Sequence, residues 1–410
     1  MLILTLNCGS SSFKCQIYDN DKGSVAAKAS VERIGLSDPI INLEVNGNKT
    51  KITDAAISGH KSAIEETLNR LQAAGAFKSI KEIGAAGHRI VHGGDLFNHS
   101  IEITDEVIKA VESVSYLAPL HNPANIEGIK ALQSMLPDIP HVAVFDTAFH
   151  QSIPEKAYRY ALPKEWYDKY KVRRYGFHGT SHLYVSKRAA KMLGKPADQC
   201  NLIILHVGNG ASVTAIKNGL SVDTSMGMTP LEGVIMGTRC GDIDPSIPAF
   251  MVKMTGKSIA EIDDMLYKKS GILGITEKYS DRRDIEANAD KDPLCKLALE
   301  MECYRLKKYI GMYCAVLNKV DAIVFTGGVG ENSATIRGMA AADLDGLGIK
   351  VDNDKNHLNI RGEEREISCD SSKVKVFIIP TDEEIVLTED VLAVLKKEYK
   401  DHIAYPYSFL

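Results

Sequence analysis

A strand followed by a glycine-containing turn occurs twice in this sequence, about half the chain apart. The first copy starts at residue 2 and reads LILTLNCGSS, and the second starts at residue 203 and reads IILHVGNGAS, so the two align without a gap. A second β-rich run follows each turn, at residues 13–18 and 213–216. The pattern predicts two β-hairpins at corresponding positions of a duplicated fold.

Both predicted turns suit the binding of phosphate groups. Glycine and small hydroxyl residues allow a tight turn that exposes backbone N–H groups, and such turns form anion-binding concavities. Two copies in one chain suit two loops that hold one polyphosphate from opposite sides. A third apolar strand at residues 322–325 also runs into a predicted glycine-rich turn, at residues 326–333.

The remaining pattern indicates an α/β fold. Helical periodicity covers residues 61–73, 105–114, 126–135 and 183–193, whereas residues 82–91 and 141–146 have the composition of strands. A chain of 410 residues is long enough for two hydrophobic cores. No linker of biased composition separates the halves, so the position of the repeats places the domain boundary near residue 150.

Composition excludes several classes of protein. A net charge of −4 gives no electrostatic basis for binding nucleic acid or an anionic membrane. The N-terminus turns polar too early for a signal peptide, and no apolar run approaches the roughly 20 residues of a membrane-spanning helix. We therefore expect a cytoplasmic protein. Eight cysteines without a CxxC pair fit neither a disulfide framework nor a zinc site.

Two arginines and a histidine stand in glycine-flanked segments. Arg89 lies in the sequence HRIVHGG, Arg239 in GTRCGD, and His178 in YGFHGTSH. The guanidinium fork matches carboxylates and phosphates, so the two arginines together indicate an anion site. Taken singly, each arginine is more often a surface or ion-paired residue, and a lone histidine in such a turn is more often a structural hydrogen-bond donor than a catalyst.

Eight motifs, in order along the chain, resemble those of the acetate kinase family. They occupy residues 7–12, 88–94, 145–150, 175–182, 206–210, 237–245, 327–332 and 380–384. The resemblance implies the fold of the acetate and sugar kinase, Hsp70 and actin superfamily: an α/β protein with two duplicated ribonuclease-H-like domains and a nucleotide cleft between them. It implies an N-terminal domain of residues 1–150 with residues 385–410 returning to it, and a C-terminal nucleotide-binding domain of residues 151–384.

The resemblance also implies a role for individual residues. The catalytic residues would be Asp146, His178, Arg239 and Arg89. Arg89 would also bind acetate, in a pocket with Val91, Leu120, Phe177 and Pro230. Asn7 and Glu383 would hold Mg²⁺, with Mn²⁺ able to replace it. The nucleotide, ATP or ADP, would contact Ser10, Ser12, Lys14, His206, Val207, Gly208, Asn209, Gly210, Asp281, Arg282, Arg283, Gly328, Val329, Gly330, Glu331 and Asn332.

The implied reaction is reversible, Mg²⁺-dependent phosphoryl transfer from ATP to acetate, which gives acetyl phosphate and ADP in a homodimeric enzyme. Acetate is ionised at neutral pH, so its direct in-line attack on the γ-phosphate needs no general base. The family role of Asp146 is catalytic acid; the chemistry favours a carboxylate that orients an arginine or a metal-bound water.

Three alternatives remain open at the level of the sequence. The acceptor could be propionate or butyrate, or the donor could be pyrophosphate; the residues 327–332 motif favours a nucleotide. A non-enzymatic, actin-like or Hsp70-like nucleotide-binding protein is the third alternative. Arg89, Arg239 and His178 argue against it, since such proteins lack a second anion pocket.

Overall fold

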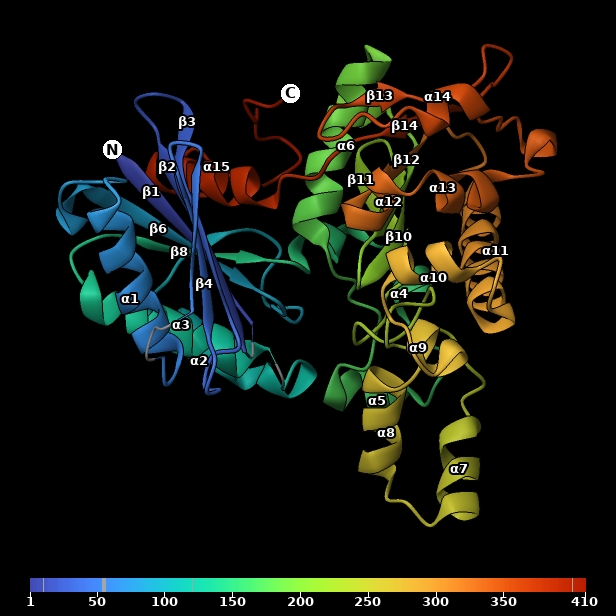
Figure 1. The fold of residues 1–410 in the computed structure, drawn as a ribbon, viewed down its shortest axis with the longest axis horizontal. Coiled ribbons are helices and arrows are strands. Elements are labelled where there is room, and N and C mark those ends of the chain that lie inside the picture. Colours follow the sequence, from blue (N-terminus) through green and yellow to red (C-terminus); the bar gives the residue numbers. More distant parts are fainter. Residues whose placement is uncertain (10, 54–56, 120, 400) are drawn as a thin grey trace. The chain divides into compact units, whose positions relative to one another are not determined.

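The computed structural model describes residues 1–9, 11–53, 57–119, 121–399 and 401–410, and these form two compact units (Figure 1). Unit 1 comprises Met1–Phe149 and Asp382–Ser408, and unit 2 comprises His150–Thr381 and Phe409–Leu410. The chain returns to unit 1 at Asp382, three residues before the expected position, because this residue caps the returning helix: its Oδ1 accepts a hydrogen bond of 3.0 Å from the backbone N–H of Ile385.

The last two residues depart from the expected assignment of residues 385–410 to the N-terminal domain. The carbonyl oxygens of Phe409 and Leu410 accept hydrogen bonds from Arg188 and Lys191, at 2.6 and 2.7 Å. The Phe409 ring also packs on Tyr184, with 4.8 Å between the ring centroids. These contacts, which no local sequence pattern signals, attach the chain end to unit 2.

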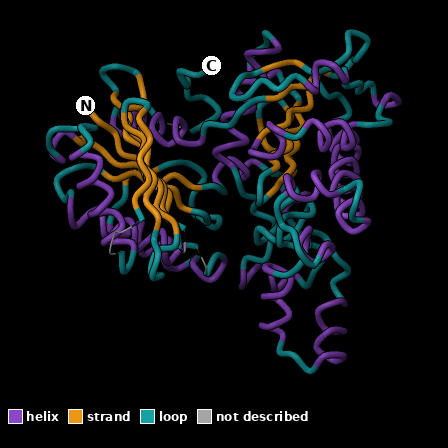
Figure 2. The backbone as a smooth tube through the Cα atoms, viewed as in Figure 1, coloured by secondary structure: helices purple, strands orange, loops and turns teal. Residues whose placement is uncertain are grey.

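Unit 1 is built on an eight-stranded sheet with the order β5-β4-β3-β2-β1-β6-β8-β7 (Figure 2). Its strands are β1 (Leu2–Cys8), β2 (Ser12–Asp19), β3 (Ser24–Glu32), β4 (Ile40–Val45), β5 (Asn48–Ile52), β6 (Ile83–Ile90), β7 (Ile101–Glu102) and β8 (His141–Phe145). Its helices are α1 (His60–Ala73), α2 (Asp105–Ser113), α3 (Asn122–Met135) and α15 (Glu383–Leu395).

The two faces of this sheet are covered by different helices. Helices α1 and α3 pack on one face, over a core that includes Leu4, Leu6 and Ile17. Helix α15 packs on the other face over β1, β6 and β8, where Leu387 and Val391 meet the side chains of alternate strand residues. Because side chains alternate along a strand, the α15 face receives the odd-numbered residues of β1 and β6 and the even-numbered residues of β8.

Unit 2 contains a six-stranded sheet with the order β11-β10-β9-β12-β14-β13. The strands are β9 (Leu202–Val207), β10 (Ala211–Lys217), β11 (Leu220–Thr224), β12 (Ala322–Thr326), β13 (Arg365–Glu366) and β14 (Lys375–Ile378). The helices are α4 (Glu155–Tyr158), α5 (Lys164–Tyr170), α6 (Gly179–Leu193), α7 (Ile247–Thr255), α8 (Ile259–Lys268), α9 (Gly271–Thr276), α10 (Arg282–Asn288), α11 (Pro293–Leu317), α12 (Gly327–Asn332), α13 (Ala334–Ala341) and α14 (Asn353–His357). Helix α6 contacts β9 and β12, whereas α11 contacts β9 and β10.

The second sheet repeats the topology of β3-β2-β1-β6-β8-β7 in the first, which confirms the predicted duplication. In each, three consecutive strands pair antiparallel, and the first of them also pairs parallel with a later strand that in turn pairs parallel with another. The two predicted hairpins are β1–β2 and β9–β10. The third predicted turn is wrong in detail, because residues 327–332 form the short helix α12 directly after β12.

Gly327 explains how a helix can begin there. Its φ is +77°, and a Cβ at this position would lie 2.9 Å from the backbone oxygen of Val207. Only glycine tolerates this combination of left-handed backbone and close approach. The chain can therefore leave β12 and turn at once into a helix whose backbone groups bond to one another.

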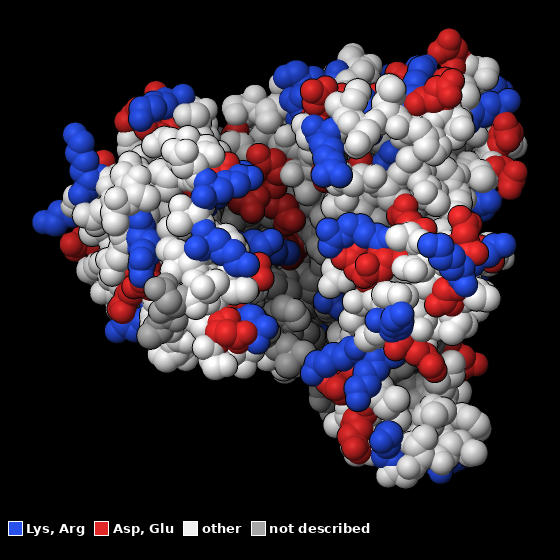
Figure 3. Space-filling model, viewed as in Figure 1, with Lys and Arg blue, Asp and Glu red and all other residues white. Residues whose placement is uncertain are grey.

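Charged side chains of both signs occur on the surface of each unit (Figure 3). Figure 3 shows basic and acidic side chains together on the visible face of each unit. No helix formed by the described residues combines the length and the apolar composition needed to span a bilayer.

The C-terminal segment attaches to α15 through a buried carboxylate. Asp390 accepts hydrogen bonds from the hydroxyls of Ser100, Tyr407 and Tyr399, at 2.6, 2.7 and 3.3 Å. Burial raises the pKa of Asp390 to about 6, although the three hydroxyl donors act in the opposite direction. These donors are neutral, so they do not compensate the buried charge as a cation would.

Lowering the pH is therefore expected to stabilise the wild-type protein relative to Asp390→Asn. A carboxyl group whose pKa is higher in the folded than in the unfolded state binds protons preferentially when folded, so its destabilising effect develops as the pH rises from about 4 to about 6. Between about pH 7 and about pH 5, the difference in the free energy of unfolding should shift by about 1 kcal/mol in favour of the wild type. Urea unfolding of both proteins measures this shift; a difference that is independent of pH would contradict it.

Candidate active site

In unit 1, four of the predicted site residues line a single cavity. This cavity has a volume of about 120 Å³ and is lined by Thr5, Leu6, Asn7, Lys14, Cys15, Arg89, Glu383, Glu384 and Leu387. Asn7 and Lys14 are directly opposite in the antiparallel β1–β2 register, so their side chains project from the same face. Arg89 is on that face by the alternation of β6, and Glu383 and Glu384 form the first turn of α15. The β1–β2 hairpin thus contributes an amide and an ammonium group to a site whose other members come from distant segments.

Asn125 of α3 joins the end of the hairpin to the end of β6. Its Nδ2 donates to the carbonyl oxygen of Cys8 at 2.7 Å, and its Oδ1 accepts from the backbone N–H of Val91 at 3.1 Å. The turn itself is closed by a hydrogen bond of 2.8 Å from the N–H of Gly9 to the oxygen of Ser12. Ser10 lies outside the described residues, so its predicted phosphate contact stays a prediction.

Arg89 is held by a buried carboxylate. Its Nε and Nη2 donate to the two oxygens of Asp146, at 2.7 and 2.6 Å, and its Nη2 lies 3.8 Å from Glu383 Oε2. Burial by itself lowers the pKa of Arg89, but Asp146 and Glu383 more than compensate, so the net shift is upward and the guanidinium stays charged. A two-point pair of this kind fixes the orientation of the guanidinium plane. His88, its neighbour in sequence, points to the opposite face of the sheet, where its Nε2 lies 2.9 Å from His141 Nδ1.

Asn7 and Glu383 fit the requirements of Mg²⁺. This ion prefers oxygen ligands and is usually bound by one or two carboxylates together with water and substrate phosphates. Both side chains line the same cavity, and the pKa of Glu384 is raised by burial and then by the charge of Glu383, which a cation would counteract. Among the described residues, no group of three or more His, Cys, Asp or Glu side chains is placed to hold a metal. The donor set suits a metal that arrives with its nucleotide.

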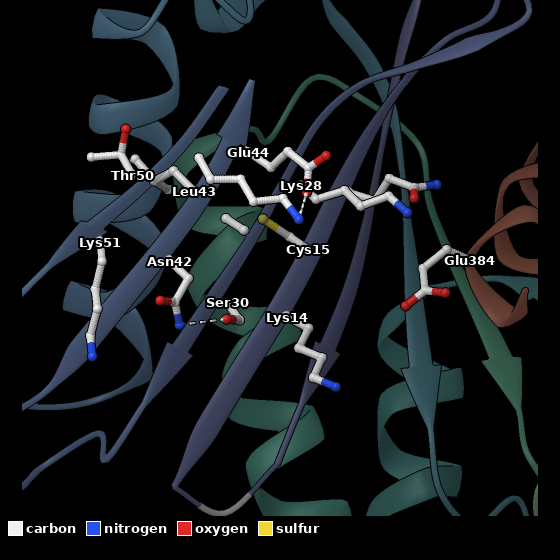
Figure 4. A pocket seen from close by; sticks show the side chains of 13 residues that line it. Lys14, Cys15, Lys28, Ser30, Asn42, Leu43, Glu44, Thr50, Lys51 and Glu384 are labelled. Atoms are coloured by element: carbon white, nitrogen blue, oxygen red, sulfur yellow. Dashed lines mark hydrogen bonds and ion pairs between the residues drawn. The ribbon is translucent and has the colours of Figure 1, made fainter. Parts of the chain in front are cut away.

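A larger hollow adjoins this cavity on the face of β2–β5 that α15 leaves uncovered (Figure 4). Its volume is about 440 Å³, and it shares Lys14, Cys15 and Glu384 with the smaller cavity. Figure 4 shows Lys28, Ser30, Asn42 and Lys51 on the same sheet face. Lys14 therefore lies at the border between the smaller cavity and the larger, polar hollow.

In unit 2, the β9–β10 turn places three predicted residues next to two others. The turn of Gly208, Asn209 and Gly210 is closed by a hydrogen bond of 3.0 Å between the Gly208 N–H and the Gly210 oxygen. A Cβ on Gly210 would lie 3.5 Å from Arg239 Nη1 and 3.6 Å from His178 Nε2. The hairpin turn, the arginine and the histidine therefore converge on one point.

His178 has an unusual backbone. It is the N-cap of α6, with φ of 57° in the left-handed region that non-glycine residues rarely adopt. Its ring stacks on His206 with a centroid separation of 4.3 Å, and its Nδ1 lies 3.0 Å from Ser212 Oγ. Residues held in such conformations cluster at functional sites, which supports a functional reading of this histidine.

Arg239 differs from the other arginines of the site in its partners. The hydrogen-bond acceptors found for it among the described residues are the Pro230 oxygen and the Met236 sulfur, at 3.1 and 3.9 Å from Nη1, and neither is a carboxylate. Burial lowers the pKa of Arg239. A partly buried guanidinium without a carboxylate partner is suited to binding an anionic ligand.

The predicted adenosine-binding residues fall into two segments. Asp281 is the N-cap of α10, and the hydrogen bonds and charge of the exposed Arg283 lower its pKa to about 2. Arg282 is committed to a fully buried ion pair with Glu302, at 2.8 Å. In α12, Glu331 Oε1 accepts from the backbone N–H of Thr381 and Asn332 Nδ2 donates to the Gly328 oxygen, so these side chains support the local fold.

The predicted acetate pocket is placed only in part. Val91 follows the last residue of β6 and is half-buried, whereas Phe177 is buried and Pro230 half-buried in unit 2. Leu120 lies outside the described residues. The methyl-binding role of these four side chains therefore stays a prediction.

Sequence reasoning missed several residues around these groups. They are Glu384, Asn125, His182 and Ser212, which touch or line the site but stand in no recognised phosphate turn. One signal was present for Ser212, since it is the last residue of the second aligned repeat. Glu384 and His182 end the recognised motifs at residues 380–384 and 175–182, which carried no role for them, whereas Asn125 is brought to the site by tertiary packing alone.

Duplicated sheets that carry hairpin turns, two arginines and a histidine at the N-cap of α6 suit a protein that transfers a phosphoryl group. The acetokinase family matches residues 2–389. The chain is 55% identical to acetate kinase of Geobacter metallireducens, over 100% of this chain and 98% of the relative. Acetate kinase of Porphyromonas gingivalis superimposes with a TM-score of 0.91 at 47% identity, covering 96% of this chain and 99% of that one. A propionate kinase from Francisella tularensis gives a TM-score of 0.89 at 40% identity, with coverage of 96% and 99%.

The chain belongs to the acetokinase family, whose members are kinases that transfer phosphate to a carboxylate.

Proposed function

We propose that this protein is an enzyme that transfers the γ-phosphoryl group of ATP reversibly to acetate, giving acetyl phosphate and ADP. The observation that carries the proposal is Arg239, a partly buried cation that lacks a carboxylate partner among the described residues and lies beside the β9–β10 turn and His178. A phosphoryl group in transit spreads negative charge over its equatorial oxygens, and fixed donors next to it lower the barrier.

Each unit carries residues of the proposed machinery. In unit 1, Arg89 holds the acetate carboxylate in a fixed orientation, and Lys14 with Ser12 binds nucleotide phosphates. In unit 2, the backbone of Gly208, Asn209 and Gly210 binds phosphate, while Arg239 and His178 donate to the transferring group. His206 and Val207 extend this contact, and residues 281–283 and 328–332 hold the adenosine end.

Asp146 acts by orienting Arg89. Acetate is already ionised at neutral pH, so the attack releases no proton that a base must accept. Both oxygens of Asp146 are occupied by Arg89 donors. The obstacle to reaction is repulsion between two anions, and a correctly oriented guanidinium reduces it.

Asn7 and Glu383 are the residues that would hold Mg²⁺, or Mn²⁺ in its place. When bound, the ion neutralises phosphate charge and orients the nucleotide. Arg89 Nη2 lies 3.8 Å from Glu383 Oε2, so the carboxylate proposed to bind the metal is next to the cation proposed to bind acetate.

A trapping assay for acyl phosphate tests the proposal directly. Purified protein is incubated with ATP, Mg²⁺ and acetate, propionate or butyrate, and the acyl phosphate is trapped with hydroxylamine. Acetyl hydroxamate should form fastest, and pyrophosphate in place of ATP should give none. Absence of any hydroxamate would favour a non-enzymatic nucleotide-binding protein.

Propionate is the alternative acceptor, because the chain is also similar to the Francisella tularensis propionate kinase, at 40% identity. Val91 follows Arg89 by two residues, directly after the end of β6, and residues two apart along a strand direction face the same way. The valine then limits the length of an acid whose carboxylate Arg89 holds.

Val91→Ala is expected to raise the ratio of kcat/KM for propionate to that for acetate roughly tenfold. Hydrophobic pockets discriminate one methylene by only about 1–3 kcal/mol, and tenfold corresponds to about 1.4 kcal/mol. Steady-state kinetics with both acids measure the ratio. A ratio within about twofold of the wild-type value would show that Val91 does not form the wall.

We propose that the protein acts as a homodimer in the cytoplasm. Helix α11 supports the dimer, because six apolar side chains at helical spacing are exposed along it: Leu294, Leu297, Met301, Tyr304, Met312 and Val316. An exposed apolar stripe of this kind, interrupted by the exposed Lys308 between Tyr304 and Met312, marks an interaction surface.

Met301→Glu is expected to convert the dimer to a monomer in analytical ultracentrifugation, since a charge would be buried in the interface. Lys296→Glu is the matched control, because it changes the charge of an exposed residue on the same helix away from the stripe and should leave the dimer intact. A dimer that persists in Met301→Glu would place the interface elsewhere.

A further inference from the structure

Two imidazole rings of unit 2 meet at one serine hydroxyl. Ser212 in β10 is directly opposite His206 in β9, and α6 lies against β9. His178 caps α6 and His182 follows four residues later, so both rings project from the same side of the helix. Ser212 Oγ lies 3.0 Å from His178 Nδ1 and 2.8 Å from His182 Nε2.

The hydroxyl has one hydrogen, so it can donate to only one of these rings and must accept from the other. If Ser212 donated to His182, the proton of that neutral ring would sit on Nδ1. This atom is buried and has no hydrogen-bond partner among the described residues. A buried N–H without an acceptor is rarer in proteins than an unused acceptor.

If the hydrogen bond between Ser212 and His182 runs in the opposite direction, His182 Nδ1 carries no proton, and only its lone pair is left without a partner among the described residues. His182 then donates from Nε2 to Ser212, and Ser212 donates to His178 Nδ1. His182 is neutral in this scheme, in accord with the burial and the nearby rings of His150 and His206, which lower its pKa well below the ordinary value.

We propose that Ser212 and His182 are positioning residues that hold His178 as the neutral tautomer with its proton on Nε2. That atom is the one near the Gly210 turn, where a Cβ on Gly210 would lie 3.6 Å from it and 3.5 Å from Arg239 Nη1. His178 thus presents a fixed N–H donor next to the arginine. The benefit to catalysis rests on the proposed function, in which this donor stabilises the transferring phosphoryl group.

The tautomer is measured first, without substrates. Protein labelled with ¹⁵N-histidine is examined by long-range ¹H–¹⁵N correlation, with signals assigned from His178→Ala and His182→Ala. The proposal expects both rings to be neutral near neutral pH with protons on Nε2. A proton on Nδ1 of His178, or a charged His182, would overturn it. This readout remains valid even if the wild type made no acetyl phosphate, which would overturn only the proposed function.

Kinetics then test the consequence. Ser212→Ala is expected to lower kcat about tenfold or more while changing KM for ATP and acetate by less than about twofold, because supporting partners of a reactive group are commonly worth 10- to 100-fold, roughly. Ser212→Thr keeps the hydroxyl and should recover most of the rate. Ser186→Ala is the matched control, since it removes another buried hydroxyl of the same region that bonds to the Leu183 oxygen.

A double-mutant cycle separates positioning from a general structural role. If Ser212 acts through His178, then Ser212→Ala should change kcat/KM by less than about twofold in a His178→Ala background. Equal losses in the two backgrounds would overturn the proposal. Circular dichroism and thermal unfolding of each variant establish that the compared proteins are folded.

Discussion

Replacing Arg239 with alanine is expected to lower kcat/KM for acetate at least about 100-fold. Loss of one preorganised donor to a developing charge costs about 2.7–4 kcal/mol in other enzymes, which corresponds to this range. Because Arg239 has no carboxylate partner among the described residues, its removal should leave no uncompensated buried charge. The fold should therefore survive, and the loss should fall mainly on kcat.

Arg188→Ala provides the comparison for this prediction. Arg188 also has a guanidinium at the surface of unit 2, but it is paired with Glu364 and is not assigned to the site. The Arg188→Ala substitution should lower stability slightly and leave turnover near the wild-type value. Near-wild-type turnover of Arg239→Ala, measured by hydroxamate formation, would remove Arg239 from the proposed mechanism.

Arg89→Ala is expected to reduce both activity and stability. Activity should fall at least about 100-fold because acetate loses its anchoring cation. Stability should fall by about 3–5 kcal/mol because the Asp146 carboxylate, with 2% of its side chain exposed, is left without its partner. Urea unfolding and steady-state kinetics on the same preparation separate the two effects.

Adding Asp146→Asn to Arg89→Ala distinguishes these losses further. The double variant should recover much of the stability, since no buried charge remains, but none of the activity.

The Asp146→Asn single variant should keep the shape of the pH–rate profile if Asp146 only orients Arg89. Loss of one limb of that profile would instead identify Asp146 as the catalytic acid.

Much of the architecture could be predicted from local sequence. The repeat at residues 2 and 203 predicted the hairpins β1–β2 and β9–β10, because strand alternation and turn chemistry are local properties. Helices α1, α2, α3 and α6 were also predicted, to within a few residues at their starts. The helix at residues 327–332 was missed, since glycine has a low helix propensity and only the contact of Gly327 with Val207 reveals why the chain turns there.

The sequence shows which residue types are present, but it did not predict which partners each of them meets. HRIVH groups His88, Arg89 and Val91 together, yet the alternation of β6 sends His88 to the opposite face and Arg89 to the cavity under α15. Arg282 and Arg283 are adjacent, but one is buried against Glu302 and the other is exposed. Which neighbour an arginine meets depends on packing, and packing brings together segments hundreds of residues apart.

The sequence by itself determined the family, the two corresponding hairpins of a duplicated fold and the residue types available for binding anions, because motifs and hydrophobic periodicity are properties of consecutive residues. Tertiary structure alone decided that both oxygens of Asp146 bind one edge of the Arg89 guanidinium, that Glu384 from the far end of the chain lines the cavity of Asn7, and that Ser212 joins His178 to His182. The physical reason is that a hydrogen bond or an ion pair depends on distances of about 3 Å and on burial, and in a chain of 410 residues only folding sets these for partners that are remote in sequence.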